Sequence, residues 1–234
     1  MSFIGDRMKR YERCNDSYLP RRIPVIIRVD GKAFHTIVKK YFGKGWSASF
    51  SDAMIEVAKK MQHEIQGCNF CYSQSDEISF LLTDYKTIDT DAWLGYCLQK
   101  LVSISSALAS SIFMYYLNNE TTHARTVNEP ICFDSRAFSL PMDDVCNYFI
   151  WRQLDAERNA ISFTGREHFS AKQLHKKSSK EIRLMLNKEG VELYDFPTIR
   201  KRGFCIIDGE VDLNIPEFTT ERSYIEKHVY VRED

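Results

Sequence analysis

The sequence lacks several features that would assign a chain to a class of protein directly. Its 32 Lys and Arg residues are balanced by 32 Asp and Glu residues, so no overall basic field indicates a nucleic-acid partner. It has no signal-peptide core at its start and no apolar run of membrane-spanning length, so we expect a cytoplasmic protein without membrane association. Its seven cysteines are odd in number and scattered, which favours reduced thiols over a disulfide framework.

One pair of cysteines, Cys68 and Cys71, has the CxxC spacing of zinc sites and redox motifs. A zinc site needs two more ligands, and neither a second CxxC nor a spaced pair of histidines follows. A redox motif normally opens a helix, whereas this one enters a predicted strand. We therefore favour two small residues in a buried strand over either functional interpretation.

The chain does contain an alternation of strand and helix patterns over 234 residues, which is enough for a full core. The patterns predict a strand at 24–30, a helix capped by Ser51 and Asp52, strands at 70–73 and 78–82, a long helix from Thr90 to about 117, and a strand at 131–134. This β-α-β-β-α-β order is the split βαβ, or ferredoxin-like, arrangement. The fold class is therefore α+β, with an antiparallel sheet and two helices on one of its faces.

The second half of the chain has a weaker pattern. It predicts a third helix at 142–160, short helices at 170–174 and 178–186, and a strand at 203–208. We expect residues 1–140 to form the main domain. Residues 141–234 are expected to form a helical and short-strand appendage that packs on this domain and does not fold independently.

Two acidic segments carry the chemistry of the sequence. An apolar run ends in Asp30 and Gly31, and two adjacent carboxylates, Asp76 and Glu77, interrupt the predicted hairpin at 70–82. In the split βαβ layout the end of the first strand lies beside this hairpin, so we expect the carboxylates to meet. Such a set would hold two Mg²⁺ ions, which is the chemistry of a nucleotidyl-transferring palm.

Each segment also has a simpler interpretation. Asp30-Gly31 suits an ordinary turn at a strand end, and Asp76-Glu77 suits an exposed hairpin turn. If the site is real, Gly31 allows a metal to approach the backbone carbonyl, and the amides of residues 32–35 can surround a triphosphate. Phe34 would then either stack on a base or belong to the core.

Five segments, in the same order along the chain, resemble motifs of the tRNA-His guanylyltransferase family. Residues 28–35 (RVDGKAFH) match RxDGxxFH, 74–80 (QSDEISF) match QSDExSF, 133–136 (FDSR) match FDGR, 151–155 (WRQLD) match WRQxD, and 200–203 (RKRG) match YRKG. The resemblance implies a palm related to those of polymerases and nucleotide cyclases. It also implies an enzyme that activates a tRNA 5′ end with ATP and extends it in the 3′→5′ direction with GTP or another NTP.

The resemblance further implies roles for individual residues. Asp30, Gly31 and Asp76 would bind Mg²⁺, and Asp30, Asp76 and Glu77 would form the catalytic set. Nucleotide contacts would come from Asp30, Gly31, Lys32, Ala33, Phe34, His35, Ser75, Asp76 and Lys100. Phosphate or tRNA contacts would come from Arg136, Arg152, Lys201 and Arg202. By analogy with the family, we expect a homotetramer.

One departure from the family pattern concerns the helix that carries WRQxD. Members that add G to tRNA-His continue it with a His-Ile-Asn-Asn-Leu-Tyr-Asn segment, whereas this chain has Glu157 in place of the His and keeps only Asn159. The chain thus resembles the guanylyltransferase-like branch, which repairs 5′-truncated tRNAs on a template. Non-templated G addition to tRNA-His, a nucleotide cyclase and a non-catalytic tRNA-binding module are the alternatives.

Overall fold

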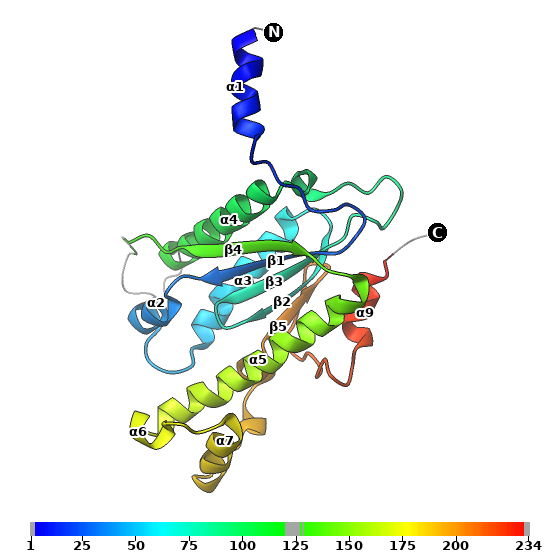
Figure 1. The fold of residues 1–234 in the computed structure, drawn as a ribbon. Helices are drawn as coiled ribbons and strands as arrows, with labels where there is room; N and C mark the ends of the chain where they lie inside the picture. The colour runs from blue at the N-terminus through cyan, green and yellow to red at the C-terminus, as the bar shows by residue number, and fades with distance from the viewer. Residues whose placement is uncertain (1–2, 120–126, 128, 232–234) are drawn as a thin grey trace.

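A six-stranded antiparallel sheet forms the centre of the molecule (Figure 1). The computed structural model describes residues 3–119, 127 and 129–231. The strand order is β4-β1-β3-β2-β5-β6. The strands are β1 (Val25–Gly31), β2 (Cys68–Gln74), β3 (Glu77–Leu82), β4 (Phe133–Ser139), β5 (Phe204–Ile207) and β6 (Glu210–Asp212).

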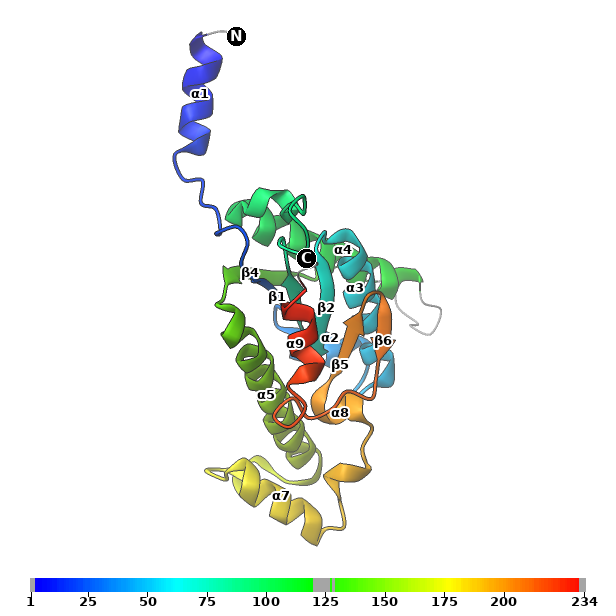
Figure 2. The same ribbon diagram turned by 90° about the vertical axis from the view of Figure 1, so that its right-hand side faces the viewer.

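Helices cover both faces of this sheet (Figures 1 and 2). On one face lie α3 (Ala48–Glu64) and α4 (Leu98–Asn119), with α2 (Phe34–Tyr41) at the end of β1; on the other lie α5 (Met142–His168) and α9 (Ser223–Val229). The short elements are η1 (Trp93–Tyr96), α6 (Ala171–Leu174), α7 (Ser179–Lys188), η2 (Leu193–Asp195) and α8 (Thr198–Arg202). The N-terminal α1 (Phe3–Arg13) stands away from the body and has no buried residue.

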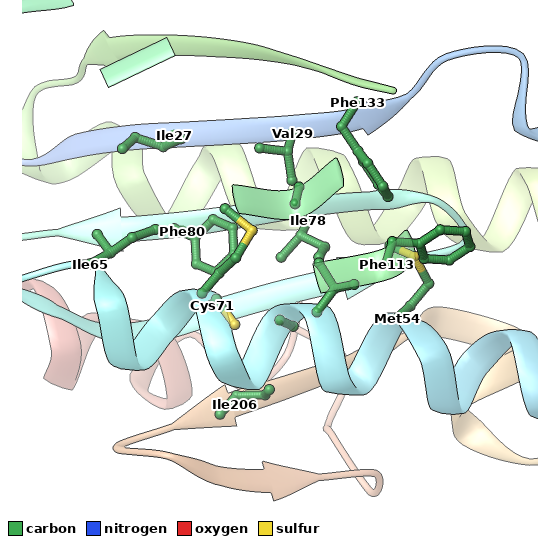
Figure 3. Close-up of a cluster of buried hydrophobic side chains, with 14 of the residues drawn as sticks. Ile27, Val29, Met54, Ile65, Cys71, Ile78, Phe80, Phe113, Phe133 and Ile206 are labelled. Carbon is green, nitrogen blue, oxygen red and sulfur yellow. The ribbon is translucent and has the colours of Figure 1, made fainter. Parts of the chain in front are cut away.

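Side chains alternate between the two faces of the central strands, which produces two apolar cores. Ile27 and Val29 point toward α3 and α4, and Figure 3 shows them in one cluster with Ile78 and Phe80. Ile26 belongs to the core beneath α5 and α9. Because both faces are covered, β1 is apolar almost throughout, and its polar residues, Arg28 and Asp30, come near the end that leads to α2.

The β-α-β-β-α-β order and the antiparallel sheet confirm the predicted fold class. The expected helix cap is wrong: α3 begins one turn earlier, where the Ser47 hydroxyl accepts a hydrogen bond from the amide of Phe50 at 3.3 Å. Helix α2 was not predicted, because it is only eight residues long. The C-terminal half contributes β5 and β6 to the same sheet, and the division at residue 140 stays a prediction.

The CxxC segment and helix α4 both belong to the core. Cys71 is fully buried in β2, where Cys68 is the first residue, as expected for a strand rather than a zinc or redox motif. The prediction that no apolar segment has membrane-spanning length is wrong for α4, whose 22 residues are long and apolar enough. Its buried residues, including Leu101 and Phe113, pack against the sheet and α3, which is the arrangement of a core helix.

Candidate active site

The two acidic segments meet at the end of β1. Strands β1 and β3 pair antiparallel with Asp30 opposite Glu77, and the Gly31 amide donates a hydrogen bond to the carbonyl oxygen of Asp76 at 3.1 Å. The tight turn between β2 and β3 consists of Ser75 and Asp76, and Ser75 has a left-handed φ of 51°. Its hydroxyl lies 3.0 Å from Asp76 Oδ1. The hairpin thus delivers the Asp76 carboxylate to the strand end that carries Asp30.

These two carboxylates are electrostatically strained. Burial raises the pKa of Asp30, and the neighbouring Asp134 raises it further. Burial also raises the pKa of Asp76, with Asp30 as the next cause. A divalent cation would offset this repulsion. Within the described residues no three His, Cys, Asp or Glu side chains form a metal cage, but Mg²⁺ commonly takes one or two carboxylates and completes its shell with water and phosphate oxygens. The donor set therefore fits Mg²⁺.

Glu77 is held differently from the other two acids. Both of its carboxylate oxygens accept hydrogen bonds from Arg152 on α5, one from Nε at 2.6 Å and one from Nη2 at 2.9 Å. Arg28 lies 3.8 Å from the same carboxylate. The expectation that Glu77 completes the acidic set stays a prediction, and its charge is already balanced by a buried arginine. Glu77 ties the hairpin to α5.

A cavity of about 720 Å³ opens at this point, within the size range of small-molecule sites. It lies between the end of β1, the β2–β3 turn, the start of α2, the loop at 43–47, and one face of α5 with α8. Its lining includes Asp30, Gly31, Ala33, Phe34, His35, Ser75, Asp76 and Glu77. The cavity thus unites most of the residues predicted to bind nucleotide.

The N-terminus of α2 faces this cavity. Ala33 adopts a left-handed conformation at φ 57°, and within the described chain no side chain caps the helix. The amides at the helix start are therefore suited to anionic oxygens. Lys32 is excluded from this role, because its amide donates to Cys132 O at 2.9 Å and its side chain is exposed outside the cavity.

Phe34 belongs to the core and does not provide a stacking platform. Its side chain is 2% exposed, and its ring centroid lies 5.0 Å from that of Phe113 and 4.7 Å from that of Phe133. The ring also explains the adjacent glycine. A Cβ on Gly31 would lie 2.3 Å from Phe34 ring atoms, so a larger residue would displace the ring that supports the site.

The predicted basic contacts are only partly in place. Lys201 and Arg152 line the cavity, but Lys201 Nζ donates to the Tyr194 carbonyl at 2.9 Å, and Arg152 is occupied with Glu77. Arg136 is exposed on β4 outside the cavity, although its charge lowers the pKa of Asp30.

Two further predicted basic contacts also lie outside the cavity. Arg202 pairs with Glu217 at 2.9 Å. Lys100 is corrected as a nucleotide contact, because α4 begins at the opposite end of the sheet. There the amide of Leu98 donates to the carbonyl of Ser17, ahead of the start of β1.

Sequence reasoning missed several residues that line the cavity: Lys44, Trp46, Asn159, Phe163, Arg166 and Arg200. A helical period was available as a signal, because Arg152, Asn159, Phe163 and Arg166 lie on one face of α5. The loop at 43–47 gave no comparable signal. Its position depends on Glu167, which accepts a hydrogen bond from the Trp46 amide at 3.2 Å and from Arg200 at 2.8 Å.

Fold and site together define the class of this protein, a nucleotidyltransferase with a palm-type sheet. Residues 5–141 match the family model described as "Thg1: tRNAHis guanylyltransferase". Since this match spans more than half of the chain, the protein belongs to the tRNA-His guanylyltransferase family.

Solved structures and curated proteins agree with this membership. A bacterial tRNA(His) guanylyltransferase (Thg1)-like protein in complex with ATP is 38% identical, with a TM-score of 0.91 over 97% of this chain and 99% of that one. The enzyme of Saccharomyces cerevisiae is 21% identical, with a TM-score of 0.73 over 88% of this chain and 95% of that one, and shares the fold. The tRNA(His) guanylyltransferase of Debaryomyces hansenii is 28% identical over 86% of this chain and 78% of its own length.

Proposed function

We propose that this nucleotidyltransferase adds nucleotides in the 3′→5′ direction to the 5′ end of tRNA, with Mg²⁺, and that it repairs 5′-truncated tRNAs on a template. The observation that supports this most directly is the shared cavity of Asp30 and Asp76, which the start of α2 also lines. Carboxylates beside free helix amides suit a substrate that carries both a metal and a polyphosphate.

Each part of the cavity would have its own role. Asp30, Asp76 and the Gly31 carbonyl would hold Mg²⁺, which when bound neutralises phosphate charge and lowers the pKa of an attacking hydroxyl. The amides at the start of α2 would bind the triphosphate of the incoming GTP or other NTP. Its 3′-hydroxyl would attack the adenylylated 5′-phosphate of the tRNA, so that a phosphodiester bond forms and AMP leaves. Lys44 and Arg166 line the same cavity and would offset the remaining phosphate charge.

Two observations favour templated repair over non-templated G addition to tRNA-His. The bacterial Thg1-like proteins, one of them 36% identical and in complex with GTP, are more similar in sequence than the yeast enzyme at 21%. On α5, Glu157 is half-buried and lies 3.6 Å from Arg202. An acid at this position changes the charge of the helix face where the G-adding members have histidine.

The test is an extension assay on 5′-labelled tRNA that lacks its first nucleotide, with ATP, NTPs and Mg²⁺. We expect longer products, and we expect Asp76→Asn to reduce extension more than about 100-fold because a metal ligand is removed. Asp89→Asn removes an exposed carboxylate far from the cavity and is the matched control. No extension of any tRNA, even one with a 5′-triphosphate, would reject the proposal.

The template requirement has its own measurement. Changing the tRNA nucleotide opposite the missing position should change the incorporated nucleotide to its complement. Incorporation of G whatever the opposing base would instead support the G-adding alternative, and a cyclic product from NTP alone would support a cyclase. The expected homotetramer is tested by light scattering on the full chain.

A further inference from the structure

The end of the molecule opposite α1 carries a concentration of positive charge. Residues 166–188, which we call the basic head, contain seven Lys or Arg residues and two Glu residues, in a chain whose total formal charge is zero. They comprise the end of α5, α6, α7 and the links between them. Figure 1 shows α6 and α7 beyond the end of α5. The basic head is therefore a local positive field on a neutral protein.

Most of this charge is not neutralised within the molecule. Lys172, Lys176 and Lys180 are exposed, and in the described part of the chain none of them forms an ion pair within 4 Å. Of the two acids, Glu181 pairs with Lys177 at 3.1 Å and Glu167 pairs with Arg200. Because these lysines are solvated and form no ion pair in the free protein, they break no internal contact and pay little free energy when they bind an external anion.

The basic head is held rigidly on α5. Ser170 and Ser178 both form capping boxes, which fix the starts of α6 and α7. Ile182 and Leu186 are buried in a small apolar cluster against α5. Gly165 of α5 allows this close approach, since a Cβ there would lie 2.7 Å from Ile182 Cγ2. The lysines therefore keep a fixed position relative to the cavity.

The positive surface is also continuous with the candidate active site. Arg166 is the first residue of the basic head and also lines the cavity. A polyanion whose end lies in the cavity would leave it along this side of α5. We propose that the basic head binds the phosphate backbone of the RNA substrate as it leads away from the 5′ end in the active site. This inference rests on the proposed function and adds the surface that holds the RNA body.

The test is the triple charge reversal Lys172→Glu, Lys176→Glu, Lys180→Glu in the full chain. Each phosphate that a lysine no longer neutralises reduces the slope of log K against log salt by about 0.9, which at 0.1 M salt is roughly eightfold in affinity. If two of the lysines contact phosphate, tRNA affinity falls on the order of 60-fold. We expect the slope to decrease by about 2, with the KM for NTP unchanged.

The matched control reverses three exposed lysines elsewhere, Lys9→Glu, Lys59→Glu and Lys227→Glu, so that the net charge changes equally. We expect it to retain tRNA affinity within about threefold, because long-range charge effects are screened at this salt. Equal losses in both variants, or no loss in the head variant, would overturn the inference. The proposed function would survive that result as long as the wild type extends tRNA, so the two failures are distinguishable.

Discussion

Removing the Arg152 guanidinium should show how much the stability of the β2–β3 hairpin depends on its contact with α5. Arg152 and Glu77 are 5% and 6% exposed, and their two hydrogen bonds form a bidentate pair. Arg152→Met keeps most of the side-chain volume and deletes the charge. The Glu77 carboxylate then stays buried, with Arg28 at 3.8 Å as its nearest cation.

The cost follows from leaving one charge of a buried pair without its partner. Such a truncation typically destabilises a protein by about 3–5 kcal/mol, far more than the net contribution of the pair itself. Arg152 also donates to Asp155 at 3.0 Å, which adds to the loss. Because Glu77 closes the turn that presents Asp76, we expect tRNA extension to fall together with stability.

The destabilisation caused by Arg152→Met should depend on pH in a direction that follows from the pKa of Glu77. Burial already raises the pKa of Glu77, and Arg152 is the main group that opposes the rise. Without Arg152 the folded-state pKa rises further above the unfolded value, so the penalty is full at pH above the folded pKa. It shrinks as the pH falls below that folded pKa and disappears below the unfolded value near 4.5, where the carboxyl is protonated in both states. The destabilisation should therefore be larger at pH 8 than at pH 5.

The assay is urea unfolding between pH 5 and pH 8, with an unchanged m-value as the check on two-state behaviour. Arg158→Met is the matched control, since Arg158 is an exposed arginine on the same helix that bonds Asp155 at 2.8 Å, and it should cost less than about 1 kcal/mol. Adding Glu77→Gln to Arg152→Met should recover much of the loss. A cost below about 1 kcal/mol, or one that does not vary with pH, would refute the reasoning.

Two further predictions concern the loop at 43–47 beside the cavity and the core beneath α5 and α9. Glu167→Ala removes the acceptor for the Trp46 amide and Arg200, so the KM for NTP should rise roughly fivefold, about 1 kcal/mol, in steady-state assays, and an unchanged KM would contradict this. Burial lowers the pKa of His228 to about 4, so the wild type should lose at most about 3 kcal/mol as the pH falls from 6.5 to 4. His228→Phe, which keeps a ring against Phe70, should flatten that decline in urea midpoints, and an unchanged decline would contradict it.

Local patterns were sufficient to find β1 to β5 and the long helices, because each has a buried face that leaves a period in the sequence, whereas β6 has no buried residue and was not predicted. Val25 to Val29 is nearly all apolar since β1 is covered on both sides, and that run predicted a central strand. The start of α3 was predicted too late, because Ser51 and Ser47 are equally good caps and only the structure shows which hydroxyl accepts the bond. The pairing of β5 with β2 left no local signal.

Similar limits apply to the site. The proximity of Asp30 and Asp76 could be predicted, because strand order alone places them side by side. The partner of Glu77 could not be predicted, because Arg152 lies 75 positions away along the chain. In the sequence, an acidic residue that binds a metal looks the same as one that binds an arginine. Lys100 was predicted as a nucleotide contact from resemblance alone, although strand order points against it. Strand β3 runs away from the turn that carries Asp76, so the helix that follows β3 begins at the far end of the sheet.

The arrangement explains why an acidic site can serve a polyanionic substrate. Asp30 and Asp76 repel phosphate unless a cation intervenes, while the positive groups that face RNA lie in the basic head, which begins at Arg166 at the edge of the cavity. Separating the two charges along α5 lets the body of the RNA bind without metal and makes only the reacting end depend on it. RNA binding should therefore persist in EDTA while extension stops. Loss of both together would show that the two surfaces do not act separately.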